Sequence, residues 1–69
     1  MNEPLLYDVN EPLLWDIETT ATKLGVSTKL VRRMVRDGEI PYLRVATLLK
    51  FQPDALRAWI AKREAEAGT

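Results

Sequence analysis

Residues 24–41 read LGVSTKLVRRMVRDGEIP, and this stretch decides the fold. Gly25 is suited to end a preceding helix, because glycine tolerates the left-handed backbone conformation of a helix C-terminus. Ser27 is a candidate N-cap for the next helix, since its side chain can accept an unpaired amide hydrogen of the first turn. Only Val26 separates the two, so the helices on either side must cross at a steep angle.

A steep crossing after so short a turn predicts a helix-turn-helix. The second helix is expected from residue 28 to about residue 37, ending at Gly38. At about 100° per residue, its apolar side chains fall on one side. They are Leu30, Val31, Met34 and Val35. Its basic side chains fall on the other side: Lys29, Arg32, Arg33 and Arg36. A solvated face usually mixes signs, and like charges four residues apart cost helix stability, so this face indicates a polyanionic partner.

The flanking residues complete a mainly α-helical fold with a small β-hairpin wing. The first helix is expected to begin at an Asp16 N-cap, with Ile17, Ala21 and Leu24 on its inner side. A short strand over residues 40–45 and its return over 48–51 form the hairpin. Its turn, residues 46–47, contains no Gly, Asn or Asp, so the register is left open.

The third helix is expected to open at residues 52–54, with proline at its first position. Its predicted core stripe consists of Ala55, Leu56, Trp59 and Ile60. The charged residues 62–66 are expected to form a fraying helical end.

Composition narrows the function classes. A chain of 69 residues forms one domain at most, and without Cys or His it lacks thiolate metal ligands and the commonest general base. We therefore expect no enzyme, no metal, no cofactor and no small-molecule substrate. No apolar run approaches the roughly 20 residues that span a bilayer, and the acidic amino terminus is unlike a secretory signal. The prediction is a cytoplasmic protein without a membrane partner.

Charge is segregated along the chain although the net charge is zero. Residues 1–16 contain four acids and no basic residue. Residues 17–50 contain seven basic residues against three acids, and residues 51–69 contain three of each. A basic middle segment is compatible with binding to nucleic acid, because clustering matters more than the total charge when phosphates are the target.

The amino terminus contains a tandem repeat of eight residues. NEPLLYDV at 2–9 is followed by NEPLLWDI at 10–17, with six of the eight positions identical. Replication slippage is one explanation. The other is a functional arm, residues 1–12, whose Leu5, Leu6 and Tyr7 pack on a neighbouring copy of the chain. The domain itself is expected over residues 13–69.

In this order, the elements resemble the MerR-like winged helix-turn-helix domains of phage excisionases and related regulators. The residues that carry the resemblance are LGVS (24–27), Val31, RDGEIP (36–41), RV (44–45) and DALRAWI (54–60). The combination is specific, although each motif alone is weak. It covers about two thirds of the chain.

The resemblance implies a recognition helix in the major groove and a wing that reaches the DNA backbone or the adjacent minor groove. The implied DNA-binding residues are Ser27, Thr28, Lys29, Arg32, Arg33, Arg36, Arg44, Thr47 and Lys50. Related wings commonly carry glycine and basic residues at the tip, where this chain has Ala46, Thr47 and Leu48. The tip is therefore open to two interpretations, contact with DNA and, through Leu48, contact between protein copies.

The resemblance further implies an excisionase in a bacterial host cell. Such a protein binds adjacent sites in attachment DNA with neighbouring copies of itself, bends the DNA and directs an integrase toward prophage excision. The absence of a ligand-binding or dimerisation domain after the DNA-binding part favours this interpretation. The first alternative is a small transcriptional regulator with the same domain. The second, from a different class, is a protein-interaction module that does not bind DNA.

Overall fold

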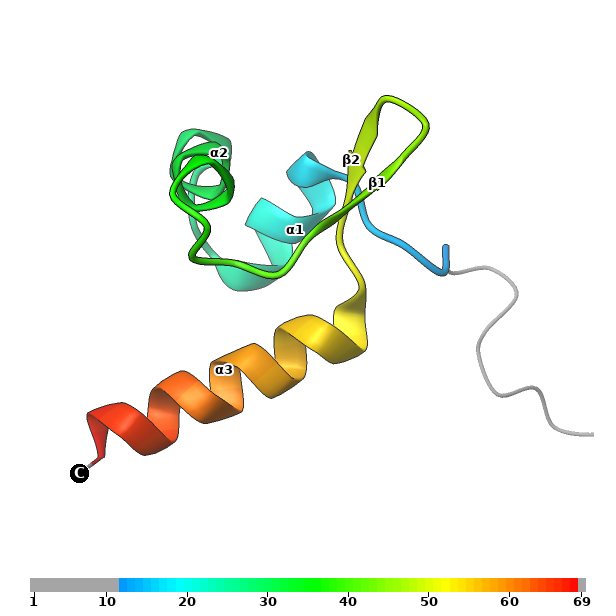
Figure 1. The fold of residues 1–69 in the computed structure, drawn as a ribbon. Helices are drawn as coiled ribbons and strands as arrows, with labels where there is room; N and C mark the ends of the chain where they lie inside the picture. Colours follow the sequence, from blue (N-terminus) through cyan, green and yellow to red (C-terminus); the bar gives the residue numbers. More distant parts are fainter. Residues whose placement is uncertain (1–11, 69) are drawn as a thin grey trace, which may run out of the picture.

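The structure is a computed structural model that describes residues 12–68. Along the chain its elements are α1 (Ile17–Leu24), α2 (Thr28–Arg36), β1 (Leu43–Val45), β2 (Leu48–Lys50) and α3 (Pro53–Ala67) (Figure 1). The predicted arm at residues 1–12, with Leu5, Leu6 and Tyr7, lies outside the described residues except for Pro12.

Side-chain caps and one glycine form the helix-turn-helix, as the sequence predicts. The Asp16 carboxylate accepts a hydrogen bond from the Thr19 amide at 2.8 Å, and Ser27 Oγ accepts one from the Leu30 amide at 3.1 Å. Gly25 has φ 75°, the left-handed conformation that ends α1. Helix α2 ends at Arg36, slightly earlier than expected, with Asp37 as its C-cap.

The hairpin forms despite its unfavourable turn sequence. Strands β1 and β2 are antiparallel, and their register pairs Leu43 with Lys50 and Val45 with Leu48. Ala46 takes the positive φ of 58° that the tight turn requires. A β-bridge between Trp15 and Phe51, with amide-to-carbonyl distances of 2.8 and 2.9 Å, fastens the base of the hairpin to the segment before α1.

The core lies where α1, α2, the hairpin base and the first turn of α3 converge. Its buried apolar residues are Ile17, Ala21, Val31, Ile40, Phe51 and Leu56. The predicted stripe of α3 is only partly right, because Ile60 is 43% exposed and Trp59 and Ala55 are half-buried. Helix α3 extends past the core, and within residues 12–68 no element packs over its second half. Residues 62–66 are helical, since α3 continues to Ala67.

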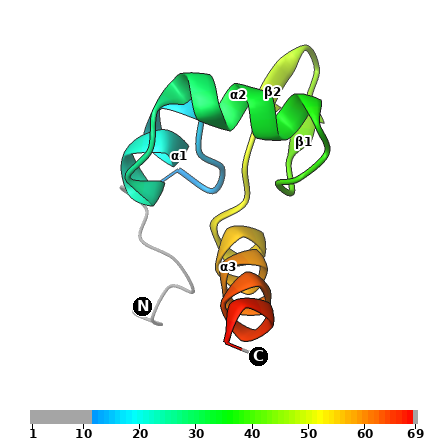
Figure 2. The same cartoon turned by 90° about the vertical axis from the view of Figure 1, so that its left-hand side faces the viewer.

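Helix α2 and the hairpin lie on the side of the molecule away from α3 (Figures 1 and 2). Helix α1 lies between them, and α3 runs beneath. This arrangement of three helices and one antiparallel hairpin is a winged helix-turn-helix fold. Among the described helices, none has the length and apolar content needed to cross a membrane.

Candidate nucleic-acid interface

The outer face of α2 presents four basic side chains. Val31, which is fully buried, fixes the opposite face against the core, while Leu30 and Met34 are half-buried beside it. At about 100° per residue, the basic residues occupy an arc of about 100° centred opposite the core. They are Lys29, Arg32, Arg33 and Arg36, and all four are exposed.

Few carboxylates of the protein itself lie close enough to neutralise this basic face. Arg36 Nε lies 3.5 Å from the Asp37 carboxylate, and both side chains are largely exposed, so the pair is readily exchanged for another anion. The other three basic residues form no salt bridge with any residue that the structure describes. An outward cluster of cations with little compensating negative charge is a surface suited to phosphates.

Two polar residues stand at the amino-terminal end of α2. The Ser27 hydroxyl oxygen is used as the helix cap, but its O–H remains able to donate, and the residue is exposed. Thr28 follows and is half-buried. The amide groups of a first helical turn carry partial positive charge, so this end adds to the attraction for an anion.

The hairpin residues predicted to bind DNA differ in their availability. Arg44 and Thr47 are exposed, whereas Lys50 is half-buried at the hairpin base. Lys50 is near enough to Asp16 to contribute to the low pKa of that carboxyl group. The pKa of Asp16 lies below its ordinary value chiefly because the Thr19 amide donates a hydrogen bond to it, and the charge of Lys50 adds to the effect.

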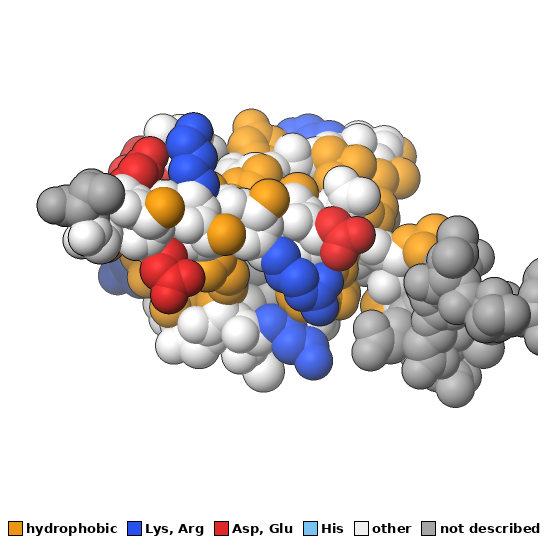
Figure 3. Space-filling model, turned by 90° about the horizontal axis from the view of Figure 1, so that it is seen from below, with side chains coloured by type: hydrophobic (Ala, Val, Ile, Leu, Met, Phe, Trp, Pro, Cys, Tyr) orange, Lys and Arg blue, Asp and Glu red, His pale blue; other side chains and the backbone are white. Residues whose placement is uncertain are grey.

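The basic side of the molecule contrasts with the side formed by α3. Seen from below, α3 displays Lys, Arg, Asp and Glu side chains close together (Figure 3). Arg57, for example, is paired with Asp54 at 3.1 Å. Mixed charge of this kind is typical of a solvated helix. The structure thus gathers the predicted basic residues of α2 on one exposed face and leaves Arg44 and Thr47 of the hairpin exposed.

Planar guanidinium groups on a helix have two uses at a duplex. They form paired hydrogen bonds to guanine O6 and N7 in the major groove, and they neutralise phosphates along its edges. Tyr42, to which the sequence analysis assigned no role, is 44% exposed directly before β1. In an extended chain it shares a face with Arg44, two residues on.

Comparison with known proteins agrees with this geometry. A family described as a helix-turn-helix domain matches residues 16–64, well over half of the chain. The chain belongs to this family. The family includes excisionase-like DNA-binding proteins, and its domain suggests sequence-specific binding to double-stranded DNA rather than catalysis. No curated protein and no solved structure matches the chain.

Proposed function

We propose that this helix-turn-helix protein is an excisionase, an accessory factor of site-specific recombination. In this proposal several copies bind adjacent repeats in attachment-site DNA, bend the duplex and direct an integrase toward excision of a prophage. Residues Ser27, Thr28, Lys29, Arg32, Arg33 and Arg36 of α2 contact the major groove. Arg44, Thr47 and Lys50 of the hairpin contact the flanking backbone or minor groove.

The observation that carries the proposal is the uncompensated basic face of α2. Four exposed cations with one weak internal carboxylate partner favour phosphate over a protein surface of mixed charge. The face is also short, since α2 has nine residues. One copy therefore makes few contacts, and useful affinity requires neighbours on adjacent sites, which is how a small protein holds a bend.

A gel-shift titration and footprint on attachment-site DNA test the proposal. We expect staggered regions of protection that fill cooperatively, and stimulation of excision when integrase is added. Arg32→Ala should abolish both at protein concentrations where Arg57→Ala, which removes the same charge from α3, retains them. A single isolated protected site in a promoter would support the transcriptional regulator instead. A chain that shifts no duplex at any salt concentration would support the protein-interaction module.

A further inference from the structure

The outward face of the hairpin is mainly apolar. Paired residues of an antiparallel hairpin point to the same side, so Leu43, Val45 and Leu48 share one face with Lys50 at its base. Phe51 is fully buried on the other side, which places these three aliphatic side chains toward solvent, with exposures of 39%, 43% and 56%. The solvent-facing side of an antiparallel sheet normally carries polar residues. An aliphatic one is therefore suited to contact with another apolar surface.

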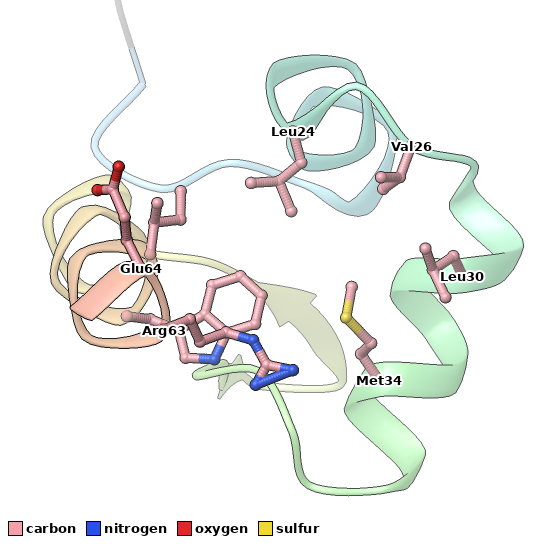
Figure 4. A pocket seen from close by; sticks show the side chains of 8 residues that line it. Leu24, Val26, Leu30, Met34, Arg63 and Glu64 are labelled. Atoms are coloured by element: carbon pink, nitrogen blue, oxygen red, sulfur yellow. The ribbon is translucent and has the colours of Figure 1, made fainter. Parts of the chain in front are cut away.

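The same chain contains a matching concave surface between the α1–α2 pair and α3. The groove has a volume of about 600 Å³. Its apolar lining comes from Leu24, Val26, Leu30, Met34, Trp59 and Ile60. In Figure 4 Leu24, Met34 and Arg63 project into one space from three different helices. The Arg63 guanidinium lies 5.3 Å from the Trp59 ring centre, at one margin of the groove, and Glu64 stands beside it.

We infer that the outward hairpin face of one copy docks into the groove of the next copy. The two surfaces cannot meet within one molecule, because the hairpin projects away from α3 (Figures 1 and 2), whose Trp59 and Ile60 line the groove. Charge supports the pairing. Lys50 shares the docking face because it pairs with Leu43, and Glu64 at the margin of the groove forms no salt bridge within the described chain.

The docking surface explains how copies on DNA would recognise one another. Because the hairpin face and the groove are different surfaces, the contact is heterologous. A pair of copies therefore keeps a free hairpin at one end and a free groove at the other, so that further copies can be added along a row of sites. Three aliphatic side chains bury far less than the roughly 1,200 Å² of a stable interface. In this respect the inference rests on the proposed function, since adjacent sites on a duplex supply the effective concentration that a weak contact needs.

Disulfide trapping tests the docking directly, because the native chain contains no cysteine. Leu48→Cys on the hairpin and Ile60→Cys in the groove replace exposed residues, so neither threatens the core. The two variants, one carrying a size tag, are mixed and oxidised with copper phenanthroline in two arms. The first arm contains protein alone at about 1 mM, a concentration at which a contact with a millimolar Kd is occupied. The second arm contains the protein bound to a long duplex. Ala58→Cys, exposed on the far side of α3, is the matched control for Ile60→Cys.

We expect the mixed 48–60 dimer to form several-fold more than the 48–58, 48–48 and 60–60 dimers in at least one of the two arms. Equal yields in both arms would overturn the docking, and so would a predominance of 60–60 dimers, which would indicate a symmetric contact between α3 helices. A gel shift on the same samples separates the two hypotheses. DNA binding without the 48–60 dimer would refute only the docking, and the dimer without DNA binding would refute only the proposed function.

Discussion

The hydroxyl group of Thr20 is buried in the core without a hydrogen-bond partner. The residue lies on the inner side of α1 with no exposed surface, and no acceptor or donor in residues 12–68 reaches its Oγ1 atom. An unsatisfied buried polar group carries the cost of its lost hydration. Thr20 is therefore a point at which the fold sacrifices stability.

Replacing Thr20 by valine keeps the shape of the side chain and removes that cost. We expect Thr20→Val to raise the free energy of unfolding by about 1 kcal/mol, measured by denaturant titration. Thr22→Val, on the exposed side of the same helix, is the control and should change it by less than about 0.5 kcal/mol. A loss of stability in Thr20→Val alone would mean that the hydroxyl has a partner.

Ala46 is a second residue at which the fold sacrifices stability, because a side chain at φ 58° crowds its own backbone. Glycine adopts this conformation freely but loses more entropy on folding. We expect Ala46→Gly to raise the free energy of unfolding by about 0.5 kcal/mol, the balance of the two effects. Thr47→Gly is the matched control: Thr47 has a negative φ, so glycine there should lower stability in the same thermal melts.

Arg32 is the residue that we expect to read a base. It lies centrally on α2, is exposed and has no salt bridge with a described residue. Arg32→Ala should weaken binding to the specific site by about 1–3 kcal/mol while changing the affinity for random duplex much less. Titrations of both duplexes by fluorescence anisotropy measure the difference. Equal losses on the two would make Arg32 a phosphate contact.

At the scale of elements, the amino terminus of α1 depends on an ionised cap. The Thr19 amide stabilises the Asp16 carboxylate, so the pKa of Asp16 in the folded chain is below its value in the unfolded chain. A lowered pKa means that the cap contributes its full stability above the unfolded pKa, about 4. The contribution is then lost as the pH falls through the folded pKa.

The lowered pKa of Asp16 predicts how the stability of the wild-type chain compares with that of Asp16→Asn, in which asparagine caps the helix without titrating. The wild-type chain should lose Tm relative to Asp16→Asn as the pH is lowered below about 4, and the difference between them should be constant near neutrality. Thermal melts followed by circular dichroism provide the measurement. A difference that is the same at every pH would show that the charge of Asp16 does not contribute to the cap.

The elements also show how far local sequence determines this fold. The ends of α1 and the start of α2 follow from Asp16, Gly25 and Ser27, because capping is chemistry within a few residues. The basic face of α2 follows from helical periodicity for the same reason. The hairpin register does not, since residues 46–47 carry no hairpin signal and the base of the hairpin is held by contacts distant in sequence, the Trp15–Phe51 bridge and the buried Phe51.

Helix α3 marks the other limit of sequence reasoning. Periodicity assigns Leu56 and Ile60 to one stripe, but only Leu56 is buried, because residues near the first turn meet the core and later ones extend beyond it. A periodic pattern identifies the apolar side of a helix without specifying what covers it. The uncovered part of that stripe is the groove wall that we assign to a second copy.

At the scale of the whole molecule, a net charge of zero coexists with a face that attracts polyanions. The cations of α2 lie on the helix face opposite the core, whereas Leu30 and Met34 line the groove beside α3, and α3 has acids and bases in equal number. Salt in solution screens charges beyond about 8 Å at physiological ionic strength. A phosphate at α2 therefore responds to the local cluster and not to the total charge.

This locality makes the salt dependence of binding a test of the interface. If Arg32 reads a base while Lys29, Arg33 and Arg36 contact phosphates, these three contacts alone should make log K fall with log salt concentration with a slope of about −3 per copy on a single-site duplex, and phosphate contacts from the hairpin would steepen it. Arg36→Ala should reduce the slope by about one unit, whereas Arg57→Ala on α3 should leave it unchanged. The reverse result would place the DNA against α3. A slope near zero in the wild-type chain would mean that the complex is held without phosphates, and the basic face of α2 would then have to be explained by a protein partner.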